Sequence, residues 1–152
     1  MYNEKKDVIV ICGPTASGKT KLGIELARNL NGEIISADSM QIYKDMDIGT
    51  AKPTLEERQM AVHHLVDFVS PDQRYSVADF KKDAVKAIEE IISRNKIPII
   101  VGGTGLYINS LIYNIDFKEE KTDLEYRKSL EEKSVQELYE MALKIDPEAL
   151  KK

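Results

Sequence analysis

GPTASGKT, residues 13–20, fits the phosphate-binding pattern G-x-x-x-x-G-K-[ST] at every position. The apolar, β-branched run 8–12 before it predicts a buried strand, and leucines spaced along one helix face follow it. Glycines in such a loop let backbone N–H groups point inward, and the following helix adds its positive end. The sequence therefore predicts a phosphate site, without saying which phosphate compound binds. Its residues are Gly13, Pro14, Thr15, Ala16, Ser17, Gly18, Lys19 and Thr20.

The composition bounds the class of protein. The chain has 152 residues, 42% of them hydrophobic and 32% charged, which is typical of one soluble globular domain with a core. The net charge of −4 argues against a strong non-specific nucleic-acid binder but leaves a site-specific one open. Cys12 is the only cysteine, so we expect no internal disulfide and a buried, inert thiol. Neither a secretory signal nor a membrane-spanning run is visible, so a cytoplasmic protein without a membrane partner is expected.

Strand and helix patterns alternate through the first three quarters of the chain. Further strands are predicted at 33–37, 62–69 and 97–101, and capping boxes predict helices after Thr54 and Ser76. This alternation predicts an α/β fold: an open parallel sheet with helices on both faces. Ligand sites in such folds lie at the carboxyl ends of the strands. The residues at those ends are the phosphate loop, Asp38 at the start of a long loop that runs to Pro53, and the Gly102–Gly105 turn.

Beyond Asp116 the strand patterns stop. Capping boxes at Thr122 and Ser134 predict two short amphipathic helices, and the pair Asp146-Pro147 predicts the start of a third. We therefore expect a core domain over 1–115, with about four strands, and the start of a helical insertion domain over 116–152.

Two residues at the expected site have both chemical and structural interpretations. Asp38 fits a general base or an indirect Mg²⁺ ligand, but it also fits a turn-forming residue. Thr104 could offer its hydroxyl to a substrate, or it could cap the helix that follows. A structural role is favoured for Asp67, because it lies inside a strand pattern. The same role is favoured for His63 and His64, because adjacent strand residues point to opposite faces and cannot readily share a metal.

Four blocks in this order resemble the bacterial tRNA dimethylallyltransferases, and together they cover residue 8 to about residue 111. They are GPTASGKT (13–20), ISADSMQIYKDMDIGTAKP (35–53), HHLVDFVSPDQRYSVADF (63–80) and PIIVGGTGLYINSL (98–111). The resemblance implies a P-loop NTPase-like fold. It also implies transfer of a prenyl group from dimethylallyl diphosphate to the exocyclic amine of the adenine 3′ to the anticodon of tRNA.

The resemblance also implies roles for individual residues. Thr15 to Thr20 would hold the diphosphate with Mg²⁺, which Thr20 would bind. The residues with catalytic roles would be Asp38 as general base, Lys19 at the leaving diphosphate and Thr104 at the target nucleotide. The tRNA contacts would come from Asp38, Ser39, Met40, Gln41, Thr104 and, more loosely, Arg127.

The family's members are longer than this sequence, so we expect a truncated chain that binds diphosphate weakly and transfers prenyl groups poorly or not at all. No pattern indicates an obligate protein partner. Three alternatives stay open: a small-molecule or nucleotide kinase that binds ATP in the same loop, an adenylate prenyltransferase, and an inactive module that binds a nucleotide or RNA. A kinase would be expected to supply a lid arginine, for which the helical tail offers Arg127.

Overall fold

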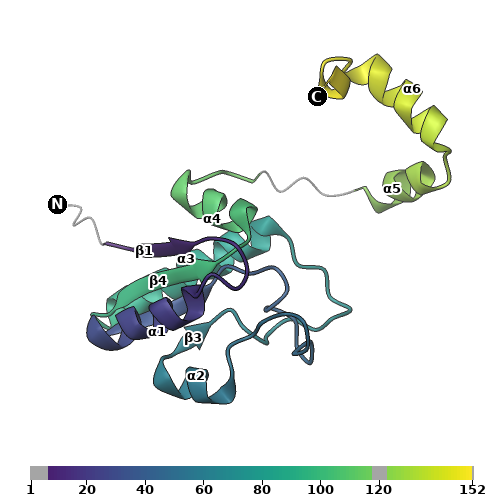
Figure 1. Ribbon diagram of the computed structural model, residues 1–152. Helices are drawn as coiled ribbons and strands as arrows, with labels where there is room; N and C mark the ends of the chain where they lie inside the picture. The colour runs from purple at the N-terminus through teal and green to yellow at the C-terminus, as the bar shows by residue number, and fades with distance from the viewer. Residues whose placement is uncertain (1–6, 118–122, 152) are drawn as a thin grey trace, which may run out of the picture. The chain divides into compact units, whose positions relative to one another are not determined.

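The computed structural model describes residues 7–117 and 123–151 (Figure 1). The chain divides into two compact units, Met1–Phe117 and Lys118–Lys152, which are described in turn. In the first unit, the described strands are β1 (Ile9–Cys12), β2 (Gly32–Ser36), β3 (His63–His64) and β4 (Ile97–Gly102). The described helices of this unit are α1 (Lys19–Asn29), α2 (Leu55–Met60), α3 (Val77–Ser93) and α4 (Gly105–Ile112).

The described strands form one parallel sheet in the order β1-β4-β2-β3, so the strand latest in sequence lies between the two earliest. Helix α1 covers one face, and α3 and α4 cover the other (Figure 1). The predicted α/β fold with a parallel sheet and helices on both faces is confirmed.

Alternating side chains of the two central strands fill two separate cores. Ile34 and Ile99 pack against α1, while their neighbours Ile35 and Ile100 pack against α3 and α4. On the second face, the rings of Phe80 and Tyr107 stack with centroids 4.1 Å apart. Since both faces of β2 and β4 are buried, these strands hold their carboxyl ends rigidly at one edge of the sheet.

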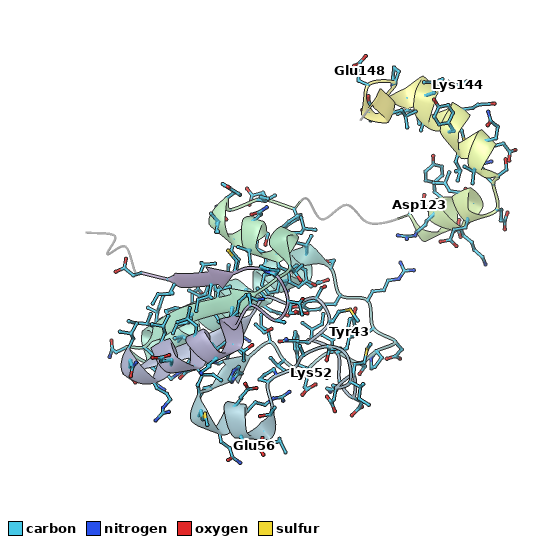
Figure 2. All side chains as sticks on the ribbon, viewed as in Figure 1. Tyr43, Lys52, Glu56, Asp123, Lys144 and Glu148 are labelled. Carbon is cyan, nitrogen blue, oxygen red and sulfur yellow. The ribbon has the colours of Figure 1, made fainter. Side chains whose placement is uncertain are left out.

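The third strand is much shorter than predicted, because only His63 and His64 pair with β2. Leu65 and Asp67 adopt left-handed backbone with φ of 59° and 57°, which turns the chain out of the sheet. The Asp67 carboxylate accepts a hydrogen bond from Lys52, which Figure 2 labels in the long loop, and lies 2.5 Å from Arg58. The prediction of a strand over 62–69 was therefore wrong. The ion pairs of Asp67 with Lys52 and Arg58 hold this segment outside the sheet, although its apolar residues are typical of a strand.

Cys12 is exposed, so the prediction of a buried thiol was also wrong. It ends β1, which lies at the margin of the sheet and, among the described residues, pairs only with β4. The apolar run that suggested a fully buried strand is thus covered less completely than β2 and β4.

Glu33 forms a buried ion-pair cluster near the amino ends of the central strands. Its carboxylate, 3% exposed as a residue, accepts hydrogen bonds from Arg94 at 2.7 Å and Lys96 at 2.8 Å and lies 2.6 Å from His64 Nε2. Burial opposes ionisation, but the bonds from Lys96, His64 and Arg94 prevail and lower the pKa of Glu33 to about 2. His64 therefore has the structural role expected for it.

The C-terminal unit contains α5 (Leu124–Glu131), α6 (Val135–Ile145) and the short 3₁₀ helix η1 (Ala149–Lys151). The predicted capping box at Ser134 is confirmed. Thr122 lies outside the described residues, and the side chain of Asp123 caps α5 instead. Asp146 accepts from the N–H groups of Glu148 and Ala149, although the turn it opens is 3₁₀ rather than α.

None of the helices in the described part of the chain is long and apolar enough to span a membrane.

Candidate functional site

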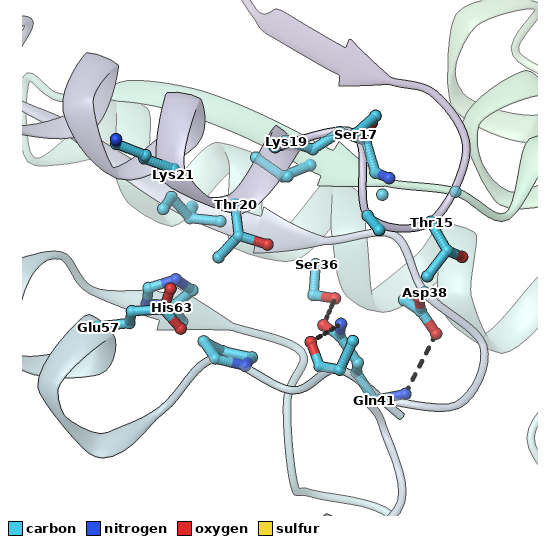
Figure 3. A pocket seen from close by; sticks show the side chains of 18 residues that line it. Thr15, Ser17, Lys19, Thr20, Lys21, Ser36, Asp38, Gln41, Glu57 and His63 are labelled. Carbon is cyan, nitrogen blue, oxygen red and sulfur yellow. Dashed lines mark hydrogen bonds between the residues drawn. The ribbon is translucent and has the colours of Figure 1, made fainter. Parts of the chain in front are cut away.

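A cavity of about 350 Å³ opens at the carboxyl ends of the central strands (Figure 3). The segment 15–21 of the phosphate loop and α1 lines it together with the strand ends at Ser36 and 101–103. The long loop after β2 contributes Asp38, Gln41, Ala51 and Pro53. Ile34 of β2, Glu57 of α2 and His63 of β3 complete the lining. The cavity thus brings the phosphate loop and Asp38 together, as expected from their places at the ends of parallel strands.

The phosphate loop leaves its backbone donors available to a ligand. Gly18 adopts left-handed backbone with φ of 84° and precedes α1 without a side-chain cap, so the first N–H groups of that helix lack a capping acceptor. The Lys19 ammonium folds back and donates to the Pro14 carbonyl at 2.6 Å. The Thr20 side chain lines the cavity next to it. A bound anion would find a cation, a hydroxyl and the positive end of a helix in one place.

Asp38 begins a tightly held turn. Its Oδ1 accepts hydrogen bonds from the N–H groups of Met40 at 2.9 Å and Gln41 at 3.3 Å, which is the turn-forming interpretation of this residue. Within the described part of the chain Oδ2 has no hydrogen bond. One oxygen therefore fixes the carboxylate while the other stays available as a proton acceptor, so the two interpretations are compatible.

Thr104, which lies between β4 and α4, is hydrogen-bonded to the same turn. Its Oγ1 accepts from the N–H of Ser39 at 3.0 Å, and its own N–H donates to the carbonyl of Ala37 at 3.2 Å. It precedes α4 but makes no side-chain capping bond. Thr104 is not among the described residues that line the cavity, so in this structure its contact is with the Asp38 segment.

Close approach of the Ala37 backbone requires glycine at the end of β4. A Cβ added at Gly102 would lie 2.1 Å from the carbonyl oxygen of Ala37, and one at Gly103 would lie 3.4 Å from that of Gly13. The turn expected at Gly102–Gly105 thus begins with a glycine at which the chain passes too close to Ala37 for a side chain. At Gly105 nothing lies within 4 Å of an added Cβ.

The long loop is fastened by Lys52, whose side chain is only 4% exposed. The ammonium donates to the carbonyl of Tyr43 at 2.7 Å, to Asp47 at 2.9 Å and to Asp67. Burial disfavours the charged form, but the two carboxylates prevail and raise the pKa of Lys52. The structural role favoured for Asp67 is confirmed, and the loop is a fixed wall of the cavity.

His63 lines the cavity, although the sequence favoured a purely structural role for it. Its Nδ1 lies 2.8 Å from the carbonyl of Ala61, which can only accept, so Nδ1 carries the proton. Burial lowers the pKa of His63, which keeps the ring neutral. Nε2 is buried without a hydrogen-bond partner among the described residues. Only the pairing of β3 beside β2 brings this ring to the cavity, and no sequence motif signals it.

Arg127 lies on α5 of the C-terminal unit, where its Nε is 3.6 Å from Glu131. The contact with tRNA expected for it, like those of Ser39 and Met40, stays a prediction.

Comparisons with known proteins agree on one family. The model of the IPP transferase family matches residues 41–152. A tRNA dimethylallyltransferase from Acetivibrio thermocellus is 59% identical over 150 residues, which are 96% of this chain and 48% of that protein. The crystal structure of a tRNA isopentenylpyrophosphate transferase from Bacillus halodurans superposes with a TM-score of 0.74 at 48% identity, covering 95% of this chain and 49% of that one. A eukaryotic dimethylallyltransferase acting on tRNA gives a TM-score of 0.78 at 41% identity, over 95% and 37% of the two chains. The chain spans about half the length of the curated relatives it matches.

Proposed function

The chain belongs to the IPP transferase family, and on this premise we propose that it supplies the donor site of a tRNA dimethylallyltransferase. The reaction is transfer of a dimethylallyl group from dimethylallyl diphosphate to the exocyclic amine of the adenine 3′ to the anticodon. The observation that carries the proposal is that the phosphate loop and Asp38 line the same cavity, with Oδ2 of Asp38 free of hydrogen bonds from any described residue. As a tRNA-modifying enzyme, the protein would act in the cytoplasm.

The phosphate loop would bind the donor's diphosphate. When the bond between the allylic carbon and oxygen breaks, negative charge grows on the leaving diphosphate. The loop N–H groups would stabilise this charge, together with the Lys19 ammonium once it exchanges the Pro14 carbonyl for the diphosphate. No group of three acidic, histidine or cysteine ligands exists among residues 7–117 and 123–151. Mg²⁺, which keeps much of its water, would instead bind the Thr20 hydroxyl and the diphosphate oxygens and neutralise their charge.

Asp38 would take up the proton that the reaction releases. The amine nitrogen attacks the allylic carbon, the carbon–oxygen bond breaks and diphosphate leaves, and one amine proton passes to Oδ2 of Asp38. A general base of this kind contributes about 10²–10⁴-fold to the rate. The adenine must leave its stack to reach the cavity, so the acceptor would be a flipped-out base.

The remaining lining suits the alkyl part of the donor. Ile34, Ala51, Pro53 and Val101 present apolar atoms in the same cavity as the phosphate loop. Burying five carbons at about 0.8 kcal/mol each would contribute about 4 kcal/mol to binding.

Ligand binding to this chain tests the proposal. Isothermal titration would compare dimethylallyl diphosphate, inorganic diphosphate and ATP, each with Mg²⁺ and with EDTA. We expect dimethylallyl diphosphate to bind more tightly than either other ligand, and only with Mg²⁺. Labelled donor would then be incubated with an anticodon stem-loop or with AMP, to distinguish a tRNA acceptor from a free nucleotide. Preferential binding of ATP, with phosphorylation of an added acceptor, would refute the proposal in favour of a kinase.

A further inference from the structure

We infer that Gln41 is a positioning residue: its side-chain amide fixes the wall 51–53 against which the alkyl tail of the donor packs. The inference rests on the proposed function, because it assumes a prenyl donor in the cavity. Resemblance alone places Gln41 in a segment that contacts tRNA, but the structure shows its side chain engaged within the cavity.

The Gln41 amide is held on both sides. Its Nε2 donates to the carbonyl oxygens of Ala51 at 2.8 Å and Thr50 at 3.3 Å. Its Oε1 accepts from the hydroxyl of Ser36 at 2.9 Å (Figure 3). Two carbonyls on one side require donors, so the orientation of the amide is fixed by its surroundings. Ser36 is 3% exposed at the end of β2, so the anchor is rigid.

The wall that Gln41 holds needs such support. Ala51 adopts left-handed backbone with φ of 48°, which is costly for a residue with a Cβ. It lies in the long loop, outside every described helix and strand. The bonds from Gln41 connect this backbone directly to the carboxyl end of β2. The side chain of Lys52, the next residue, fastens the loop to Tyr43, Asp47 and Asp67, whereas the Gln41 amide is bonded to Ser36 of β2.

The hydrogen bonds also indicate which part of the donor the wall meets. Both N–H bonds of Gln41 are used on carbonyls, so the side chain has no donor left for a diphosphate. The phosphate loop already provides the cation and N–H groups for that part. The lining residues that Gln41 holds in place, Ala51 and Pro53, have apolar side chains. A positioning role at the tail follows, rather than one at the phosphate.

Comparison of two ligands isolates this role. The variant Gln41→Met keeps the length of the side chain but removes all three hydrogen bonds. We expect its affinity for dimethylallyl diphosphate with Mg²⁺ to fall about tenfold. This is the loss expected when about two of the donor's five alkyl carbons are no longer buried against the wall. Its affinity for inorganic diphosphate should stay within about twofold of wild type, since the phosphate loop is untouched. Gln73→Met, at an exposed position outside this cavity, is the matched control and should change neither affinity.

Each other outcome has a definite meaning. An equal loss for both ligands, with an unchanged melting temperature, would overturn the inference, as would unchanged donor binding with a loss only of anticodon stem-loop binding. If Gln41→Met melts well below wild type, Ser36→Ala tests the inference in its place. It removes only the hydrogen bond from the Ser36 hydroxyl to Gln41 Oε1. It should lower the affinity for dimethylallyl diphosphate about two- to threefold and leave the affinity for inorganic diphosphate unchanged. Wild-type chain that binds both ligands equally would overturn the proposed donor, and the inference with it. Wild type that prefers the donor while both variants retain that preference would overturn the inference alone.

Discussion

Replacing Glu33 with glutamine should remove much of the chain's acid sensitivity. Glu33 is buried, and its pKa is lowered from 4.5 to about 2 against the cost of burial. At about 1.36 kcal/mol per pKa unit, this corresponds to about 3 kcal/mol of stability from ionisation in the folded state. Because the folded pKa lies below the unfolded one, that stability is fully present above pH 4.5 and is lost as the pH falls towards 2. Glu33→Gln has no such contribution to lose.

Urea unfolding, followed by far-UV circular dichroism at several pH values from 7 to 2, measures this difference. The wild-type free energy of unfolding should fall by about 3 kcal/mol more than that of Glu33→Gln across this range. Glu90→Gln is the control, since Glu90 is half exposed and lies 4.0 Å from Lys86, a type of pair that contributes under about 1 kcal/mol. If Glu33→Gln loses stability with pH as steeply as wild type does, the cluster around Glu33 does not stabilise the fold in the way described.

Three further substitutions probe the site. Gly102→Ala should destabilise the chain by about 3 kcal/mol or more in urea unfolding, because its Cβ would lie 2.1 Å from the Ala37 carbonyl; Gly105→Ala, with open space around it, should be near neutral. Lys19→Met should weaken inorganic diphosphate binding by about 10–150-fold in calorimetry, as expected for a lost charged hydrogen bond, and a smaller change would mean that the backbone dominates. Asp38→Asn should keep the turn and the affinity for dimethylallyl diphosphate. When the same substitution is made in one of the longer relatives, the rate of transfer to tRNA should fall by about 10²–10⁴-fold. Full transfer activity would exclude Asp38 as the base.

Local sequence signals account for the elements and for the place of the site. The capping residues Thr54 and Ser76 mark helix starts, and both are found with reciprocal capping boxes. The phosphate loop and Asp38 meet because parallel strands end at one edge of the sheet. These features depend on residues close together in sequence, or on a rule of topology that alternating patterns reveal.

Features that depend on distant partners could not be predicted. The strand pattern after His64 fails because Asp67 is drawn to Lys52, 15 residues earlier. The Gln41 amide looks like any polar loop residue until Ala51 folds back onto it. In the sequence Glu33 is an ordinary polar residue of a strand. Its ion-pair partners Arg94 and Lys96 lie more than 60 residues later in the chain. In each case the partner is chosen by tertiary geometry.

The sheet order has a consequence for the order of folding. β1 and β2 have no hydrogen bonds to each other, and both pair with β4, which begins only at Ile97. The phosphate loop, although it lies among the first twenty residues, therefore cannot take its final place until nearly a hundred residues have been made. Such long-range pairing slows folding, because the entropy cost of closing a large loop comes before the contacts between the strands lower the free energy. We expect the binding site to appear late and in a single step, together with the central strand, rather than to grow from the loop outward.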